Sequence, residues 1–162
     1  MLCGDLNSKM PLFLSTFTNK IDVKGRVSVP ASFRASLAAE PYQGIVVFRS
    51  HAHPALEGFA FSSMQDIASR LDHYDLFSGE QDDLATAIFG DSVQLPFDGD
   101  GRIILPESLI AHAGLDGQAA FVGLGQKFQI WKPEEFDGRR DAARGNVKSG
   151  KLTIPKASGG AS

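Results

Sequence analysis

The amino-acid sequence predicts an α+β protein in which two related β units intertwine into one pseudo-twofold barrel with helices on its flanks. Two observations lead to this prediction. A motif of turn and strand residues occurs twice at an offset of 76 residues, and each copy is followed by the same order of short apolar runs. A unit of about 60 residues has little core on its own, so we expect the halves to bury their apolar faces together.

The repeat is clearest at two Asp-x-x-Gly-Arg segments. Residues 22–34 read DVKGRVSVPASFR, and residues 98–110 read DGDGRIILPESLI. Gly25 and Gly101 stand where a tight hairpin turn needs a positive φ, which glycine adopts without steric cost. The two segments therefore predict two matching hairpin loops.

Each loop lies within the same order of expected elements. Pro30 and Pro106 follow the strand after each loop and suit the first turn of a short helix, because that position needs no N–H donor. The expected strands are 11–16, 26–29, 45–48 and 59–61 in the first half, matched in that order by 92–97, 102–105, 120–123 and 128–130 in the second.

Helical patterns join and follow the two halves. Ser63 is placed to cap a helix with apolar residues at i, i+3, i+4 and i+7, and a second helix is expected to end at Gly90. Residues 58–97 hold one Lys/Arg against seven Asp/Glu, so this region is acidic. The predicted organisation is a first unit at 11–62, an acidic helical connector at 63–91, a second unit at 92–132, a C-terminal helix at 133–144 and a flexible basic tail at 145–162.

Composition excludes several classes of protein. The chain has 162 residues, 43% hydrophobic and 22% charged, so it is neither disordered throughout nor collagen-like. Its one cysteine, Cys3, excludes an intrachain disulfide and a thiolate metal cluster. No apolar run approaches the roughly 20 residues that span a bilayer, so we expect neither a membrane partner nor export.

The formal net charge of −3 is unevenly distributed along the chain. Residues 1–57 carry a net +2 and residues 137–162 a net +4, and they flank the acidic middle. Nucleic acid responds to local fields, so one cationic face is compatible with binding it despite the acidic average. A solvated surface with a flexible tail is the alternative interpretation of the same charges.

No motif indicates an enzyme, a metal site or a cofactor. The sequence has no Gly-x-Ser-x-Gly, Walker or dinucleotide-binding fingerprint. The stretch from Asp98 begins like a calcium loop but has isoleucine where that loop needs glycine and leucine where it needs glutamate. His51 and His53 are expected on a solvent-exposed loop. We therefore expect no cofactor and no small-molecule substrate.

The arginines that close the two loops carry the most specific chemistry. The planar guanidinium of Arg26 or Arg102 suits phosphate oxygens or guanine O6 and N7. A carboxylate four residues earlier, Asp22 or Asp98, is placed to orient it. The alternative is a plain hairpin turn, in which the aspartate accepts backbone N–H bonds and the arginine is only a surface residue.

The first loop is the more cationic of the two. Lys24 lies beside Arg26, and Arg34 is on the helix that follows, whereas the second copy has Asp100 and Ile110 at those positions. If both loops touch DNA, the first should contribute more electrostatic affinity.

These residues resemble the MraZ family. Residues 18–34, TNKIDVKGRVSVPASFR, are similar to the first motif of that family, and residues 98–106 with 112–115 to the second. The final strand, FQIW at 128–131, also fits, and the resemblance covers roughly residues 11–144. It implies two halves of the AbrB/SpoVT swapped-hairpin type. It also implies a bacterial transcriptional regulator that binds repeated DNA elements upstream of the division and cell-wall gene cluster. Such proteins form ring homo-oligomers in the cytoplasm, on the nucleoid.

Carried over residue by residue, the resemblance implies a set of DNA-facing and loop-shaping residues. The DNA-facing residues would be Lys24, Arg26 and Arg102, with Arg34 as a weaker addition; the loop-shaping residues would be Asp22, Gly25, Asp98 and Gly101. A second hypothesis is an antitoxin-like protein-interaction module of the same fold that uses its C-terminal tail, 145–162. The tail lacks an amphipathic apolar pattern, which counts against that hypothesis.

Overall fold

The fold is mixed α+β, as predicted. The computed structural model describes residues 10–75, 77–150 and 152–157, and the chain divides into two compact units between Lys132 and Pro133. The strands are β1 (Thr16–Lys20), β2 (Arg26–Ser28), β3 (Gly44–Arg49), β4 (Leu56–Phe59), β5 (Val93–Pro96), β6 (Arg102–Ile104), β7 (Gln118–Gly123) and β8 (Phe128–Trp131). The helices are α2 (Ala31–Ser36), α3 (Phe61–Leu71), α4 (Gly79–Ala85), the π-helical turn η1 (Thr86–Gly90), α5 (Glu107–Ala113) and α6 (Pro133–Gly150).

The two halves exchange their first strands. The larger sheet has the order β1-β7-β8-β4-β3-β5, with antiparallel pairs throughout. The first strand of one half, β1, therefore pairs with β7 of the other half, and β5 pairs in return with β3. Matching β1 to β5, β3 to β7 and β4 to β8 reverses the order onto itself, so the sheet has a pseudo-twofold axis between β4 and β8.

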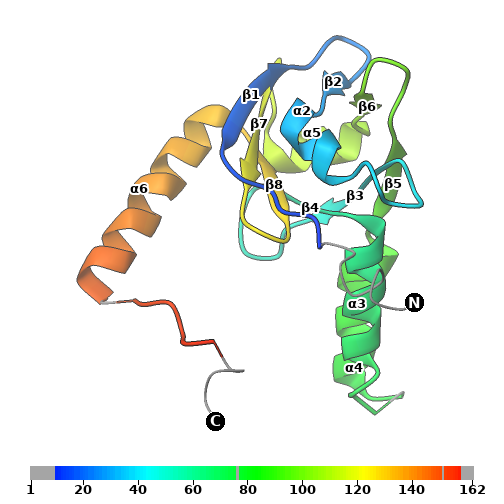
Figure 1. Ribbon diagram of the computed structural model, residues 1–162, viewed down its shortest axis with the longest axis vertical. Helices are drawn as coiled ribbons and strands as arrows, with labels where there is room; N and C mark the ends of the chain where they lie inside the picture. Colours follow the sequence, from blue (N-terminus) through cyan, green and yellow to red (C-terminus); the bar gives the residue numbers. More distant parts are fainter. Residues whose placement is uncertain (1–9, 76, 151, 158–162) are drawn as a thin grey trace. The chain divides into compact units, whose positions relative to one another are not determined.

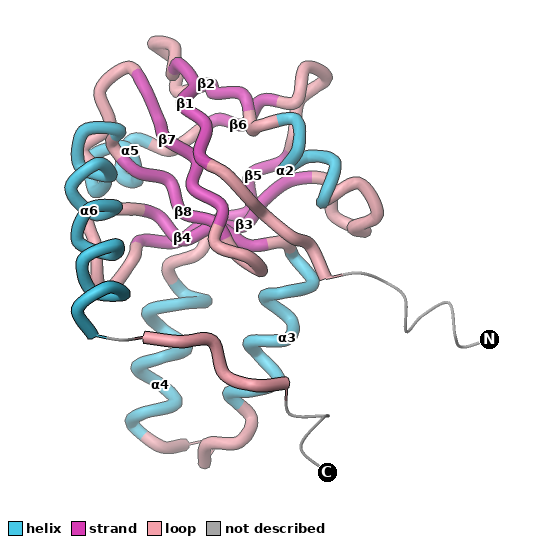
Figure 2. Tube along the Cα trace, turned by 60° about the vertical axis from the view of Figure 1, so that its left-hand side comes forward, coloured by secondary structure: helices cyan, strands magenta, loops and turns pink. Residues whose placement is uncertain are grey.

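The other two strands form a separate ribbon. β2 and β6 pair antiparallel, one from each half, with Val27 opposite Ile103. Figures 1 and 2 show this ribbon, with the connections that lead into it from β1 and β5, at one end of the compact unit that ends at Lys132. The α3–α4 helical hairpin extends from the opposite end (Figure 2). The Asp-x-x-Gly-Arg loops therefore lie far from the acidic hairpin.

The predicted closed barrel is not found among the described residues. The six-stranded sheet ends on β1 and β5, and it does not continue as a ladder into the β2–β6 ribbon. An isolated bridge between Ile21 and Val27 links the end of β1 to the ribbon. The intertwining itself comes from the exchanged strands and the shared ribbon.

The main core fills the space between the sheet and the ribbon. Phe33 of α2 meets Phe13 and Phe128 with ring centroids 5.1 and 5.3 Å apart, and all three side chains are fully buried. Val27 and Ile103 of the ribbon belong to the same cluster. Both halves thus contribute to one core, which neither would complete alone.

Strand β3 is buried on both faces. Ile45 and Val47 join the main core, whereas Val46 and Phe48 pack with Met64 of α3 in a second cluster. This explains why the strand reads as an unbroken apolar run and not as an alternation.

The first strand of the chain begins later than predicted. The expected strand 11–16 is reduced to a single bridge between Phe13 and Gly125, and the regular ladder starts at Thr16. Ser15 has φ 73°, in the left-handed region, so the backbone turns there and cannot continue an extended run.

The predicted matching of the later strands has the wrong register. Gly44 pairs with Pro96 and Gln118 with Lys20, so Ile45 corresponds to Ala119 and not to Ala120. A one-residue slip places every side chain on the opposite face of a sheet. Short apolar runs that are buried on both faces carry no alternation that would have fixed this register.

The last strand of the first half lies earlier than predicted. It is Leu56–Phe59, and Phe61 already begins α3. Phe59 thus corresponds to Trp131, and Glu57 pairs with Gln129 at the pseudo-twofold axis.

The Glu57 carboxylate is a buried acidic group on that axis. It accepts hydrogen bonds from Lys127 Nζ at 2.9 Å and from Gln129 Nε2 at 3.1 Å. Burial would raise the pKa of Glu57, but hydrogen bonds from Lys127, Ser50 and Gln129 outweigh it and lower that pKa.

Helix α3 is not capped by Ser63, contrary to the prediction. Ser63 lies inside the helix, where its side chain is buried. The first turn is held instead by Glu40, whose carboxylate accepts from the Ser62 N–H at 3.1 Å and from the Ser62 hydroxyl at 2.8 Å. A cap supplied from 22 residues away is invisible to local sequence patterns.

Helix α6 runs to Gly150 and is longer than the predicted 133–144. Gly145 costs a helix about 1 kcal/mol relative to alanine but does not end it. Within the helix, the Arg140 guanidinium lies 4.8 Å from the centre of the Phe136 ring. No helix in the described part of the chain is both long and apolar enough to cross a membrane.

We predict that Gly58→Ala destabilises the compact unit that ends at Lys132 by about 1–3 kcal/mol or more. The added methyl group would overlap the ring of Phe128 on the neighbouring strand. Gly79→Ala is the matched control, since an added methyl group meets nothing within 4 Å there. Urea unfolding of both variants measures the difference. Equal midpoints for the two variants would contradict this account of the sheet centre.

Candidate nucleic-acid interface

The loop before β2 is organised by one carboxylate. Asp22 Oδ1 accepts from the backbone N–H groups of Lys24 and Arg26, both at 2.9 Å. Its Oδ2 accepts from the Arg26 guanidinium Nε at 2.6 Å. Gly25 completes the turn with φ 83°, and its N–H donates to Asp22 O at 3.0 Å.

The loop before β6 repeats this arrangement bond by bond. Asp98 Oδ1 accepts from the N–H groups of Asp100 and Arg102 at 2.8 and 2.9 Å, and Oδ2 accepts from Arg102 Nε at 2.9 Å. Gly101 has φ 76°. The roles predicted for the aspartates and glycines are therefore consistent with the geometry of both loops.

The carboxylates direct the arginines outward. Each aspartate occupies the Nε side of its guanidinium, and no described residue accepts a hydrogen bond from the terminal Nη groups of Arg26. Those groups keep the fork geometry that suits a phosphate or a guanine edge. The arginine side chains are 35% and 34% exposed, so both are partly buried and partly open to solvent.

Hydrogen bonding keeps both carboxyl groups ionised. The backbone N–H of Arg26 holds the pKa of Asp22 below its usual value, and the N–H of Arg102 does the same for the pKa of Asp98. Both groups are exposed, so the loops keep their negative partner at all pH values above the ordinary aspartate range.

Each loop is completed by the other half of the chain. The Val29 N–H donates to Gly101 O at 3.1 Å, and the Leu105 N–H donates to Gly25 O at 2.9 Å. A Cβ on Gly25 would stand 2.8 Å from Leu105 O, so glycine is required there for close approach as well as for its φ. The two arginines are thereby held on one rigid ribbon.

Arg34 serves the second loop, although it belongs to the first half. Its Nε donates to Val29 O at 3.1 Å, and a Cβ on Gly101 would lie 2.6 Å from that nitrogen. The position matched by the repeat, Ile110, instead lies beside Gly25 of the first loop. The sequence assigned Arg34 to the first loop, because the repeat does not show that the helix after each loop packs against the loop of the other half.

The loops differ in charge. Lys24 is exposed on the first loop. On the second loop Asp100 takes that position, and its carboxylate lies 3.4 Å from Arg102 Nη2. Arg34 thus adds a positive charge beside the second loop, which has fewer cationic residues of its own than the first.

Two contributors to this surface were missed from the sequence. The Asn19 side-chain amide donates to Ser28 O at 2.7 Å and ties β1 to the ribbon. Ile104 is 60% exposed beside Arg26 on the outer face of the ribbon. Its exposure contradicts the apolar pattern of residues 102–105, which is why the sequence did not single it out.

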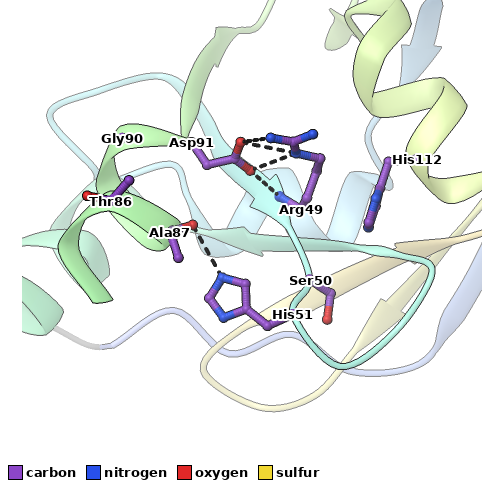
Figure 3. A pocket seen from close by; sticks show the side chains of 8 residues that line it. All are labelled: Arg49, Ser50, His51, Thr86, Ala87, Gly90, Asp91 and His112. Atoms are coloured by element: carbon purple, nitrogen blue, oxygen red, sulfur yellow. Dashed lines mark hydrogen bonds and ion pairs between the residues drawn. The ribbon is translucent and has the colours of Figure 1, made fainter. Parts of the chain in front are cut away.

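A second polar cluster lies at the end of β3 (Figure 3). The Arg49 guanidinium forms an ion pair with Asp91, and the backbone N–H of Arg49 donates to the same carboxylate at 2.9 Å. Hydrogen bonding from the Arg49 side chain lowers the pKa of Asp91. This pair joins β3 to the turn that follows η1.

The histidines do not come together. His51 Nε2 lies 3.3 Å from Ala87 O, whereas the His53 ring packs 5.3 Å from that of Trp131. Within the described ranges, no group of three or more His, Cys, Asp or Glu side chains is placed to hold a metal ion. Cys3 lies outside the described residues.

Comparison with known proteins identifies related sequences. A family model described as "MraZ protein, putative antitoxin-like" matches residues 88–143. The chain is 47% identical over 143 residues to a transcriptional regulator MraZ of Gluconobacter oxydans (strain 621H), covering 86% of this chain and 87% of that protein. A protein with the same name from Rickettsia rickettsii (strain Sheila Smith) is 42% identical over 148 residues, covering 91% and 99%. One from Rickettsia bellii (strain OSU 85-389) is 42% identical over 146 residues, covering 90% and 97%.

We predict that Asp22→Asn combined with Asp98→Asn removes an acid-dependent part of the stability. Because the folded pKa of each aspartate is depressed, its contribution is complete above the unfolded value of about 3.9 and is lost as pH falls through the folded pKa. The gap in urea midpoint between wild type and variant should therefore be widest near neutral pH and narrow below about pH 4. Parallel curves at all pH values would contradict this role.

Proposed function

The chain belongs to the MraZ family of transcriptional regulators, and from that premise we propose that it binds double-stranded DNA through its two Asp-x-x-x-Arg loops. The proposed targets are repeated promoter elements upstream of the division and cell-wall gene cluster. The observation that carries the proposal is the bond-by-bond match of the loops at Arg26 and Arg102. A purely structural turn would not require an arginine held in the same way twice.

The shape of the ribbon suits a DNA groove. A two-stranded antiparallel ribbon fits the major groove of B-DNA. In the register of β2 and β6, Arg26 lies opposite Ile104 and Ser28 opposite Arg102, so these four side chains share the outer face. The same ribbon turns Val27 and Ile103 into the core, which keeps the outer face rigid.

The charges suggest how affinity and specificity are divided. Lys24 and Arg26 make the first loop the stronger site for phosphate, and Arg34 supports the second loop beside Arg102. Phosphate contacts would make binding fall with salt, whereas an arginine that reaches guanine would select sequence. Such a division fits a chain of net charge −3 whose positive charge is local.

The finer structural and cellular proposals follow from the family. The exchange of β1 and β5 supports an AbrB/SpoVT-type swapped-hairpin relation between the halves. We propose a ring homo-oligomer that acts in the cytoplasm on the nucleoid. Because one chain offers few cations, several identical ribbons on evenly spaced repeats would add affinity through effective concentration.

The alternative function is an antitoxin-like interaction with a protein partner through the C-terminal tail. In its described part, Leu152 and Ile154 are exposed at 61% and 92%, and these are the apolar anchors that such a partner would bury. Recovery of a stoichiometric protein partner that is lost on deleting 145–162, with no retention on DNA, would favour this alternative.

We predict that Arg26→Ala and Arg102→Ala each weaken binding to the protein's own upstream DNA by about 1–3 kcal/mol if they contact bases. Arg70→Ala is the matched control, because Arg70 is an exposed arginine in an i,i+4 pair with Asp66 on α3, at the opposite end of the fold. Fluorescence anisotropy at two salt concentrations, with a shuffled duplex for comparison, measures the effect. The proposal fails if wild type shows no preference for its own DNA, or if the three variants bind alike.

We predict that a duplex with two correctly spaced elements binds about 10²–10⁴-fold more tightly than a duplex with one. Size-exclusion chromatography with light scattering on the same samples reports the number of chains. A monomer in solution, or equal affinity for one and two elements, would contradict the ring proposal.

A further inference from the structure

The two ends of the ribbon are related by the pseudo-twofold axis but carry different side chains. At the first loop, Arg26 lies opposite Ile104. At the second loop, Arg102 lies opposite Ser28. Each arginine therefore has one cross-strand neighbour on the outer face, aliphatic at one end and a hydroxyl at the other.

Ile104 belongs spatially to the first loop. Its Cγ2 lies 3.8 Å from the place of a Cβ on Gly25, and its side chain is 60% exposed. Ile103, the residue before it, is 1% exposed and anchors the strand in the core. The exposure of Ile104 is thus fixed by the alternation of the strand and is not a result of local mobility.

Only one group in the major groove of DNA is apolar. It is the C5-methyl group of thymine, which cytosine and uracil lack. An isoleucine beside a guanidinium offers such a surface both an apolar contact and a neighbouring polar contact. A serine in the same position offers a hydroxyl group, which contacts several bases without that preference.

We propose that Ile104 reads the C5-methyl group of a thymine next to the base or phosphate engaged by Arg26. This inference rests on the proposed DNA-binding function. The first loop then demands a thymine, whereas the second loop, with Ser28, does not. The two loops of each chain accordingly differ in the base they select, although their backbones are related by the pseudo-twofold axis.

The test uses the full-length protein and its own upstream DNA, with each thymine replaced in turn by uracil. We expect one thymine in each element to be sensitive. Replacing it by uracil, which removes the contacted methyl group, should weaken wild-type binding about threefold to fivefold. Ile104→Ser should bind the thymine and uracil duplexes equally. Ile104→Val, which keeps an aliphatic surface, should retain the discrimination, and Arg70→Ala on α3 should leave the thymine-to-uracil ratio of wild type unchanged.

The outcomes separate this inference from the function on which it rests. If wild type does not prefer its own DNA over a shuffled duplex, the DNA-binding proposal itself fails. If wild type prefers its own DNA but no uracil substitution weakens binding, the inference is overturned while the function stands. It is also overturned if Ile104→Ser keeps the thymine-to-uracil binding ratio of wild type, whatever the number of chains in its oligomer.

Discussion

The hydrogen bonds that the two halves exchange at the ribbon are the interaction on which the rest of the structure depends. Val29 N–H reaches Gly101 O, and Leu105 N–H reaches Gly25 O. Each loop is thereby tied to the backbone of the other half. The exchanged strands β1 and β5 and the shared core at Phe33 and Phe128 follow from the same intertwining.

Within this frame, the loop aspartates are best understood as positioning groups. Each carboxylate accepts two backbone N–H bonds and one guanidinium bond, which use most of its acceptor capacity within the loop. The Nη groups of Arg26 then remain for a ligand, whereas Arg102 Nη2 lies 3.4 Å from the Asp100 carboxylate. Pre-organising a long side chain in this way lowers the entropy lost when it binds, which matters for a surface with so few cations.

The sequence predicted what is local and repeated. The turn glycines, the Asp–Arg pairs and the helices after Pro30 and Pro106 are encoded within about fifteen residues, and the second copy made each of them recognisable. It did not predict what depends on distant partners. Glu40 caps α3 from another loop, and Arg34 packs on the loop of the opposite half. The sequence also did not predict the register of β3 against β5, because a strand buried on both faces shows no alternation of polar and apolar residues.

Duplication explains how the surface can be symmetric in backbone and asymmetric in chemistry. The backbone bonds at Gly25 and Gly101 constrain both loops equally, while the outward positions at Lys24 and Asp100 are free to differ. A single chain thus presents two related contact points with unequal charge.

The most direct test of the central claim is a structure of the oligomer bound to its own upstream DNA, determined by cryo-electron microscopy. The account predicts the β2–β6 ribbon in the major groove, with the tips of Arg26 and Arg102 on base edges or phosphates and their Nε atoms still bonded to Asp22 and Asp98. DNA held by α6 or the tail, with the ribbon facing solvent, would contradict it.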